Sequence, residues 1–473
     1  MLSKVTGLII LLTAMQSLGI ANAKSGAARG YQFLLNGNYT GCGIPLTVLT
    51  RASRAQKLVP KAIQNKLFAS PFEEFLQPVN HENRQKQGDN IPRSVSIFKS
   101  AREHEVLNVN CLSCHSDRLD GQTIIGLGNR SRDFTQNLLP LAQALTMFAW
   151  SPKEKEELRL FQRSIQAIAP YMQAKTIGVN PAINITYALF SQRHFEDFTW
   201  SPSPVMPPPP RDFPPVAVPP WWRMKSKDSM FYNGEFTSQH HRVMSLAAAF
   251  CMDDASDIRA LEDEFRDVEV YIRSLKAPTY PGTINDELAA HGERIFNQTC
   301  SSCHGTYGPD GDYPELIIPI EVIGTDPALM EQQTGEEYAR FRKWGAKAFT
   351  AIYDEHLSSN GKRGYLAPSL EGVWAIAPYF HNGSVPSLAA VLNSKIRPKV
   401  WRKIGVGKDQ DYDVKAMRVR YEALTFQRYR AAKRFQAYIY DTSLPGYGNQ
   451  GHTFGDEFSP EERRAVLEYL KTL

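Results

Sequence analysis

Two short cysteine motifs constrain this chain more than any other feature. Residues 110–118 read NCLSCHSDR and residues 299–307 read TCSSCHGTY, so the spacing C-x-x-C-H occurs twice. The two copies use four of the six cysteines. The fold must therefore arrange each pair of thiols, together with the histidine that follows it, around a group that all three can bind.

The adjacent histidine decides between the chemistries open to a C-x-x-C pair. A disulfide or a thioredoxin-like redox pair does not require it, and a zinc site needs a second ligand pair nearby, which neither motif has. In C-x-x-C-H the thiols can bond covalently to a haem while the histidine binds its iron. We therefore predict two covalently bound c-type haems. The predicted attachment residues are Cys111, Cys114 and His115 for haem 1, and Cys300, Cys303 and His304 for haem 2.

The first residues predict export. Residues 1–23 combine a basic start, a short apolar run and small residues at positions 21 and 23. This pattern is typical of a secretory signal peptide, and the apolar run is too short to span a bilayer. No later stretch approaches the roughly 20 apolar residues of a membrane helix. We expect a periplasmic or secreted protein with no membrane span.

Composition agrees with a large exported protein and argues against a nucleic-acid partner. Of the 473 residues, 42% are hydrophobic, which is ample for a substantial core. The formal net charge is +5, and the basic residues are scattered instead of forming an arm or a long run. We therefore expect no binding to nucleic acid.

The two remaining cysteines are Cys42 and Cys251. Export to an oxidising compartment favours a disulfide between them, and buried free thiols are the alternative. We predict the disulfide.

An internal repeat accompanies the two motifs. The ending VEVYIRSLKAP at 268–278 is similar to the C-terminal RRAVLEYLKTL at 463–473, and FYNGEF at 231–236 is similar to FHNGSV at 380–385. Such self-similarity indicates a duplicated unit. We predict a mainly α fold of two tandem cytochrome c-like domains, with long loop-rich extensions and little regular sheet. The predicted division is a signal peptide at 1–23, an N-terminal domain with haem 1 at 24–280, and a C-terminal domain with haem 2 at 281–473.

Three segments give sharper local predictions. Ser151, Pro152 and Glu154 form the capping-box pattern of a helix start. The segment ELAAHGERIFNQTCSSCH predicts an amphipathic helix that leads into the second motif, with Gly292 and Phe296 suited to a close crossing with the C-terminal helix. The proline-rich residues 201–220 are either an exposed linker or an extended wall over the core, and the aromatic segment that follows favours the wall.

The second axial ligand of haem 2 has two histidine candidates. His452 lies in the glycine-rich loop GYGNQGHTFG just before the terminal helix, and we predict it as the ligand. The alternative is His381, which could instead contact a haem propionate or lie between the haems. Met330 and Met417 are weaker alternatives because their surroundings are polar.

The distal side of haem 1 is predicted from residues 221–241. Trp221 and Trp222 could form an apolar wall or ordinary core packing. His240 or His241 could act as an acid–base group, or both could be capping or solvated residues. The residues we predict as catalytic are Trp222, His240 and His241.

Several motifs occur in a specific order: CLSCH, PPWWRMK, CSSCH, APYFHNGSVPSL, DTSLPGYGNQGHTFG and the ending YLKTL. Together they resemble the rubber-oxygenase-like di-haem cytochromes, within the superfamily of bacterial di-haem cytochrome c peroxidases. The resemblance implies that the haem on His115 is the reactive one. It also implies that the haem on His304 is six-coordinate, with His452 as distal ligand, and that Trp222 lies near the reactive haem.

These observations predict a periplasmic di-haem c-type cytochrome that acts as a peroxidase- or oxygenase-like oxidoreductase. Haem 1 would react with a small-molecule oxidant, peroxide or dioxygen, and haem 2 would transfer electrons with a periplasmic redox partner. The alternative is a pure electron-transfer cytochrome with two six-coordinate haems. A haem-bearing sensor is a third class, which no partner motif supports.

Overall fold

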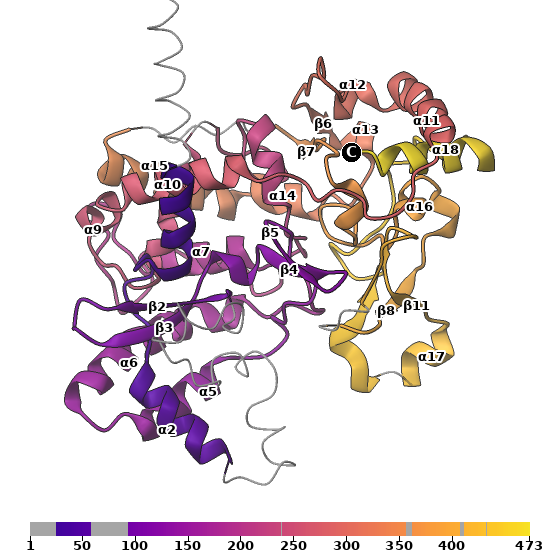
Figure 1. Ribbon diagram of the computed structural model, residues 1–473. Helices are drawn as coiled ribbons and strands as arrows, with labels where there is room; N and C mark the ends of the chain where they lie inside the picture. The colour runs from indigo at the N-terminus through magenta and orange to yellow at the C-terminus, as the bar shows by residue number, and fades with distance from the viewer. Residues whose placement is uncertain (1–24, 58–92, 238, 356–361, 407–410, 432) are drawn as a thin grey trace, which may run out of the picture.

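The structure is a computed structural model (Figure 1). The predicted signal peptide, residues 1–23, lies outside the described residues. Within the described part, no helix combines the length and apolarity needed to cross a membrane. The described residues are 25–57, 93–237, 239–355, 362–406, 411–431 and 433–473.

The described chain is mainly α, as expected. The longer helices are α2 (Leu46–Lys57), α6 (Pro152–Ile168), α7 (Ala182–Ser191), α10 (Glu262–Ser274), α11 (Asp286–Thr299), α15 (Glu336–Tyr353) and α18 (Pro460–Leu470). The shorter ones are α5 (Leu139–Ala144), α8 (His240–Ser245), α9 (Ala255–Arg259), α12 (Ser301–His304), α13 (Ile320–Ile323), α14 (Ala328–Thr334), α16 (Leu388–Val391) and α17 (Phe426–Ala431). The 3₁₀ turns are η2 (Cys111–Ser113), η3 (Leu145–Phe148), η4 (Ala169–Tyr171), η5 (Trp221–Ser226), η6 (Leu246–Phe250), η7 (Val373–Ala375), η8 (Ser394–Ile396) and η9 (Lys433–Tyr438).

The sheets in the described residues are small and antiparallel. Two have three strands, in the orders β1-β3-β2 and β11-β8-β12, and the others are two-stranded ribbons. Ile44 and Ile97 both pair with Leu107 in the first sheet, which fixes its register. The strands are β1 (Ile44–Pro45), β2 (Val95–Lys99), β3 (Glu105–Val109), β4 (Ser116–Leu119), β5 (Gln122–Ile125), β6 (Ile317–Pro319), β7 (Gly364–Leu366), β8 (Val400–Lys403), β9 (Tyr412–Asp413), β10 (Arg418–Val419), β11 (Tyr421–Ala423) and β12 (Ile439–Asp441).

The capping box at the start of α6 is confirmed. The Ser151 hydroxyl accepts a hydrogen bond from the Glu154 backbone at 3.2 Å, and the Glu154 carboxylate accepts one from the Ser151 backbone at 3.0 Å. The same carboxylate binds Arg51 and Thr47 on α2. Burial opposes ionisation of Glu154, but these hydrogen bonds hold its pKa well below the usual range. One residue thus caps α6 and joins it to α2.

Two helix crossings depend on glycine. A side chain at Gly292 on α11 would overlap the Ala465 carbonyl on α18, and the neighbouring Phe296 and Tyr469 rings lie 5.3 Å apart. The predicted crossing is therefore confirmed, and Figure 1 shows α11 and α18 side by side. Residues 25–36 form a helix that sequence analysis did not anticipate, and a side chain at Gly30 would overlap the Asp267 carbonyl on α10. Each half of the chain has one such crossing.

The repeated hexapeptides adopt the same turn. The Met230 backbone donates to Phe236 at 2.8 Å, and the Tyr379 backbone donates to Val385 at 2.7 Å. Phe231 and Phe380 both have positive φ, at 60° and 70°. A rarely adopted backbone angle at equivalent positions indicates that the sequence repeat is also a structural one.

The proline-rich segment 201–220 is a wall and not a free linker. Its Val216 carbonyl accepts a hydrogen bond from Asn180 at 2.7 Å, and its Ala217 backbone donates to His381 at 2.7 Å. A side chain at Gly128 would overlap the Val218 carbonyl. The segment therefore lies between the two halves of the chain and contacts both.

The apolar cores do not follow the predicted division at residue 280. That position lies in the connection between α10 and α11, yet α15 packs on the N-terminal helices. Phe341 of α15 stacks on Tyr187 at 4.4 Å, and Trp344 lies 4.8 Å from Phe190. The two halves therefore share packing, and the proposed domain limits stay a prediction.

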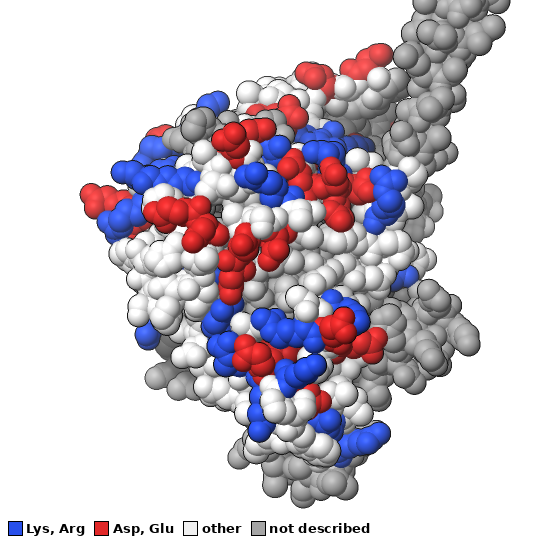
Figure 2. Space-filling view, turned by 90° about the vertical axis from the view of Figure 1, so that its left-hand side faces the viewer, with Lys and Arg blue, Asp and Glu red and all other residues white. Residues whose placement is uncertain are grey.

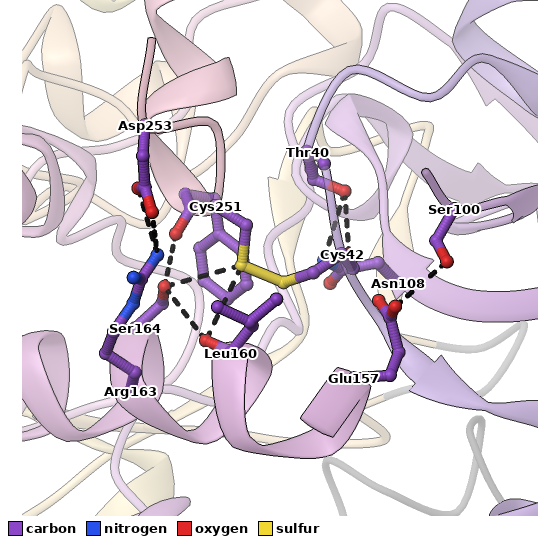
Figure 3. Close-up of a disulfide and its surroundings, with 12 residues drawn as sticks. Thr40, Cys42, Ser100, Asn108, Glu157, Leu160, Arg163, Ser164, Cys251 and Asp253 are labelled. Carbon is purple, nitrogen blue, oxygen red and sulfur yellow. Dashed lines mark hydrogen bonds and ion pairs between the residues drawn. A yellow bond between two sulfur atoms is a disulfide. The ribbon is translucent and has the colours of Figure 1, made fainter. Parts of the chain in front are cut away.

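The disulfide between Cys42 and Cys251 is confirmed (Figure 3). The two Cα atoms are 5.7 Å apart, within the usual disulfide range. Asn108 donates to the Cys42 carbonyl at 2.8 Å, and the Ser164 hydroxyl lies 3.5 Å from the Cys251 sulfur. The bond ties the start of β1 to the end of η6 inside the N-terminal half.

On the face shown in Figure 2, acidic and basic side chains are interspersed, and neither sign forms a continuous field. The expectation of no nucleic-acid partner stays a prediction.

Candidate functional site

The second C-x-x-C-H motif lies at the end of α11 and in the short helix α12. The backbones of Cys303 and His304 both donate to the Cys300 carbonyl, at 3.2 and 3.0 Å. Residues three and four positions apart in a helical turn share one face. Gly305 ends this turn with φ of 80°. The turn therefore presents both thiols and the imidazole to the same space.

A proline carbonyl orients His304. The His304 Nδ1 lies 2.8 Å from the Pro368 carbonyl, and because a carbonyl can only accept, Nδ1 carries the proton. Nε2 is then the nitrogen with a lone pair that can bind a metal. Burial lowers the pKa of His304, which favours the neutral form that metal binding requires.

His452 stands opposite His304. The two ring centres are 6.1 Å apart. Two imidazoles that bind one metal ion through bonds of about 2 Å have ring centres about 6 Å apart. Burial lowers the pKa of His452 to about 4, so this ring is also neutral near pH 7. The alternative candidate His381 does not face His304 in this way and stacks instead on Tyr365 at 4.1 Å.

Several contacts fix the loop that carries His452. The His452 backbone donates to Ile323 at 2.7 Å, and a side chain at Gly451 would overlap the Gly324 backbone. Arg397 donates from Nη1 to the carbonyls of residues 449 and 451, at 2.8 and 2.6 Å, and from Nη2 to the His452 carbonyl at 3.0 Å. The loop is thus held from both sides, which leaves the His452 ring little freedom to move away.

Both histidines line a cavity of about 270 Å³. Its lining is mostly apolar and includes Cys300 and Cys303 together with Leu366, Val373 and Leu388. An apolar enclosure of this kind excludes water from a large planar ligand and strengthens electrostatic interactions inside it.

Four residues in the lining of this cavity have buried polar atoms without a hydrogen-bond partner in the described chain. They are Arg223 (Nε and Nη2), Thr325 (Oγ1), His381 (Nε2) and His452 (Nδ1). An unpartnered buried polar group is costly, and proteins rarely keep one without a reason. This donor set fits a cofactor that brings a metal and carboxylates, as a haem does.

The first C-x-x-C-H motif has the same local geometry. The backbones of Cys114 and His115 both donate to the Cys111 carbonyl, at 3.2 and 3.1 Å. Asn110 caps the turn by accepting from the Leu112 backbone at 3.0 Å. Both motifs therefore form one helical turn with thiols and imidazole on one face.

His115 also has a proline carbonyl beside it. Burial lowers the pKa of His115 to about 3, and the nearby Pro219 backbone partly opposes this effect. His115 Nδ1 has no hydrogen-bond partner in the described chain. Pro219 precedes Phe231 by 12 positions, and Pro368 precedes Phe380 by the same 12. The two prolines are therefore equivalent members of the repeat.

The aromatic neighbour of His115 is Trp221. Its ring stacks on the His115 ring at 4.5 Å with an angle of 18°. In the described chain no second histidine pairs with His115 as His452 pairs with His304. Trp222 points elsewhere: it is 0% exposed, and its indole donates to the Glu371 carbonyl at 2.8 Å. Trp222 thus joins the two halves, and its catalytic assignment stays a prediction.

The histidine doublet begins α8 and faces α10. His240 is buried and uses both nitrogens, because Nε2 donates to the Asp228 carbonyl at 2.8 Å and Nδ1 accepts from Arg273 at 3.1 Å. His241 Nδ1 lies 3.0 Å from the Glu269 carboxylate. Burial opposes ionisation of Glu269, but bonds from His241 and Arg273 lower its pKa to about 2. The doublet braces α8 on α10, and a catalytic role for it stays a prediction.

Comparison with known proteins identifies one segment. Residues 364–402 match the family model described as RoxA-like, cytochrome c-like. The segment contains β7, the turn at 380–385 and Pro368, the residue that orients His304. The match supports a RoxA-like cytochrome c relationship, and a cytochrome c-like domain implies covalently bound haem.

Two curated relatives come from Sinorhizobium fredii. The uncharacterised protein y4iJ is 26% identical over 261 residues, which cover 42% of this chain and 41% of y4iJ. The uncharacterised protein y4iM is 28% identical over 155 residues, which cover 27% of this chain and 33% of y4iM. The chain therefore matches less than half the length of either relative.

Proposed function

We propose that this chain is an exported di-haem c-type cytochrome oxidoreductase, built from two tandem cytochrome c-like units. The observation that carries the proposal is the placement of His304 and His452 with ring centres 6.1 Å apart across a cavity that also receives Cys300 and Cys303. The paired glycine crossings and the paired turns support a second unit around Cys111, Cys114 and His115.

The second site has the residues for a six-coordinate haem. Cys300 and Cys303 would bond to the porphyrin, and His304 and His452 would be the axial ligands. A c-type haem supplies a one-electron couple, and when one axial position is open it can also react with dioxygen or peroxide. Two protein ligands would close both positions at this site, so its role would be electron transfer. The apolar lining and the carbonyl of Pro368 would hold the cofactor and its proximal imidazole in place.

The first site is the proposed place of reaction with peroxide or dioxygen. His115 would be the proximal ligand, with Trp221 packed on its ring. The proposed surrounding residues are Trp222, His240 and His241, which lie in η5 and α8, and both of these segments pack on α10. Of the two histidines, His241 is the better proton carrier, because both nitrogens of His240 are already engaged and His241 Nε2 lies 3.6 Å from Glu262, beyond hydrogen-bond length.

The alternative function is electron transfer alone, with a second protein ligand also at haem 1. The histidine pair His304–His452 suits that role equally, so the two functions differ only at the first site. Carbon monoxide binding to the reduced holoprotein separates them, since an open haem binds it and a closed one does not. Periplasmic export and a redox partner belong to both proposals.

Mass spectrometry of the denatured holoprotein tests the proposal. We expect a gain of two haem groups on the mature chain, because each motif supplies two thiols. The double variants Cys111→Ala/Cys114→Ala and Cys300→Ala/Cys303→Ala should each lose one haem and keep the other. A mass of bare polypeptide from cells that mature c-type cytochromes would overturn the proposal.

A further inference from the structure

Arg223 has an unusual position for a buried cation. It belongs to η5, two residues after the Trp221 that stacks on His115, and it is 7% exposed. Yet it lines the cavity that contains His304 and His452. A residue of the first site's own segment thus reaches into the second site.

The guanidinium of Arg223 has no partner for two of its three nitrogens. Nε and Nη2 are buried and make no hydrogen bond within the described chain. Glu371, a carboxylate that acts on the charge of Arg223, pairs through Oε1 with Lys225 at 2.8 Å and makes no ion pair with Arg223. Burial lowers the pKa of Arg223, but a guanidinium stays protonated in proteins. Two donor nitrogens of a buried cation are therefore left without an acceptor, which protein interiors strongly disfavour.

Other buried arginines also have unpartnered nitrogens, but they have a carboxylate beside them. Arg130, whose Nε and Nη1 lack a hydrogen-bond partner in the described chain, lies 3.4 Å from Asp117 and 3.4 Å from Asp411. Arg193 pairs with Asp253 and donates to the Ala249 carbonyl. Arg223 differs from these two arginines. Within the described residues it makes no ion pair with a carboxylate, and it lines the cavity that His304 and His452 also line.

The surroundings of Arg223 favour a carboxylate as the missing partner. A small cavity of about 30 Å³ lies beside it, lined by Lys227, Tyr232 and Tyr313, and also by Pro219 and Pro368. Arg223, Lys227 and the Tyr232 phenol around one space match an anion that accepts several hydrogen bonds, whereas Tyr313 already donates to the Ala367 carbonyl. Arginine offers a planar pair of donors that fits a carboxylate better than any other side chain does.

We propose that Arg223 binds a propionate carboxylate of the haem held by the second motif. This inference rests on the proposed function and adds to it. The propionates are the anionic groups of a haem, and they arrive with the cofactor, so the cation has its partner only in the loaded protein. The segment η5 carries both Trp221, which contacts His115, and Arg223. A segment of the first site would therefore neutralise a propionate charge of the haem in the second site.

The midpoint potential of haem 2 tests the proposal, followed through the low-spin ferric signal during a redox titration of the holoprotein. Arg223→Met leaves the propionate unneutralised, and its negative charge stabilises ferric over ferrous iron. In Arg223→Met we expect the ratio of oxidised to reduced haem 2 at a fixed potential to be about tenfold higher than in wild type. For a one-electron couple, this ratio corresponds to a midpoint potential lowered by about 59 mV. Arg223→Lys keeps the charge and should recover most of the shift.

Lys225→Met is the matched control. It removes one positive charge from the same segment, but Lys225 is partly exposed and already paired with Glu371. We expect a shift several-fold smaller than that of Arg223→Met. Equal shifts in the two variants, or no shift in Arg223→Met while both haems remain attached, would overturn the Arg223 proposal and leave the proposed function intact. Absence of a haem at the second motif would instead contradict the proposed function.

A structure of the wild-type holoprotein keeps the test decisive if Arg223 variants do not fold. We expect a guanidinium nitrogen within about 2.7–2.9 Å of a propionate oxygen. A propionate that points away, with Arg223 bound to water or to another side chain, would overturn the inference.

Discussion

The two C-x-x-C-H sites share a scaffold and differ in what faces the histidine. In each, one helical turn gathers two thiols and an imidazole, a proline carbonyl lies beside the imidazole, and a glycine lets two helices cross closely. At the second site His452 stands opposite His304. At the first site the ring in contact with His115 is Trp221, which stacks on its flat face.

The location of this difference is informative. The shared parts lie in the repeated segments, whereas His452 comes from a loop held by Gly324 and Arg397. On the proposed function, the repeat would supply the attachment of a cofactor, and a loop outside the matched segments would supply its coordination. A duplicated unit can in this way keep the residues that attach a cofactor and change the residue that faces its histidine, without altering its helices.

The largest expected effect comes from removing the opposing histidine. His452→Ala should convert haem 2 from low-spin to high-spin and let the reduced form bind carbon monoxide, because one axial position becomes open. Absorption spectroscopy of the holoprotein measures this. His381→Ala is the control and should leave the low-spin spectrum unchanged, since His381 stacks on Tyr365 and does not face His304. The reverse result would move the ligand assignment to His381.

The next effect concerns chemistry at the first site. His241→Ala should lower turnover with peroxide or dioxygen by about 10²-fold, at the low end of what a proton-transfer group contributes. Both haems should stay attached, and the haem 2 spectrum should not change. His291→Ala, an exposed histidine on α11, should retain full turnover. Equal turnover in His241→Ala and wild type would make the doublet purely structural.

The disulfide joins two segments of the N-terminal half, so its removal should affect the stability of that half more than that of the C-terminal half. Cys42→Ser/Cys251→Ser should lower the free energy of unfolding by about 2–4 kcal/mol, because a long loop is no longer closed in the unfolded chain. Denaturant unfolding of the oxidised holoprotein measures this. We expect the first site's absorption to be lost at lower denaturant than in wild type, with a smaller change at the second site. A coincident shift of both sites would indicate that the shared core unfolds as one unit.

The smallest effect compares the two helix crossings. Gly30→Ala and Gly292→Ala should each lower the free energy of unfolding by about 1–3 kcal/mol, because the added methyl group overlaps a backbone carbonyl. Gly345→Ala is the control: this helical glycine has open space around it and should gain up to about 1 kcal/mol. If either Gly30→Ala or Gly292→Ala were as stable as Gly345→Ala, the helices at that position would not cross closely. The two halves would then not have equivalent helix crossings.

Sequence reasoning reached the features that local chemistry determines. The capping box at Ser151, the Gly292 crossing and the Cys42–Cys251 bond follow from spacing, propensity or compartment. The helix at residues 25–36 was missed because a long insertion separates it from the first motif. The repeat could have found it, since AARG at 27–30 parallels AAHG at 289–292.

Sequence reasoning did not reach features that depend on side-chain direction. Trp221 and Trp222 are adjacent, but only Trp221 stacks on His115, and Trp222 reaches the Glu371 carbonyl instead. His240 and His241 likewise differ in the partners they meet. The unpartnered nitrogens of Arg223 become visible only when the cavity of the other half is in place.

Electron paramagnetic resonance of the ferric holoprotein tests most directly the central claim that the two sites hold haems of unlike coordination. We expect two signals in equal amount, one low-spin signal typical of two imidazole ligands and one high-spin signal from an open site. His452→Ala should remove the low-spin signal and leave the high-spin one. Two low-spin signals in the wild-type protein would contradict the account and favour an electron carrier, and a single haem signal would contradict the duplication itself.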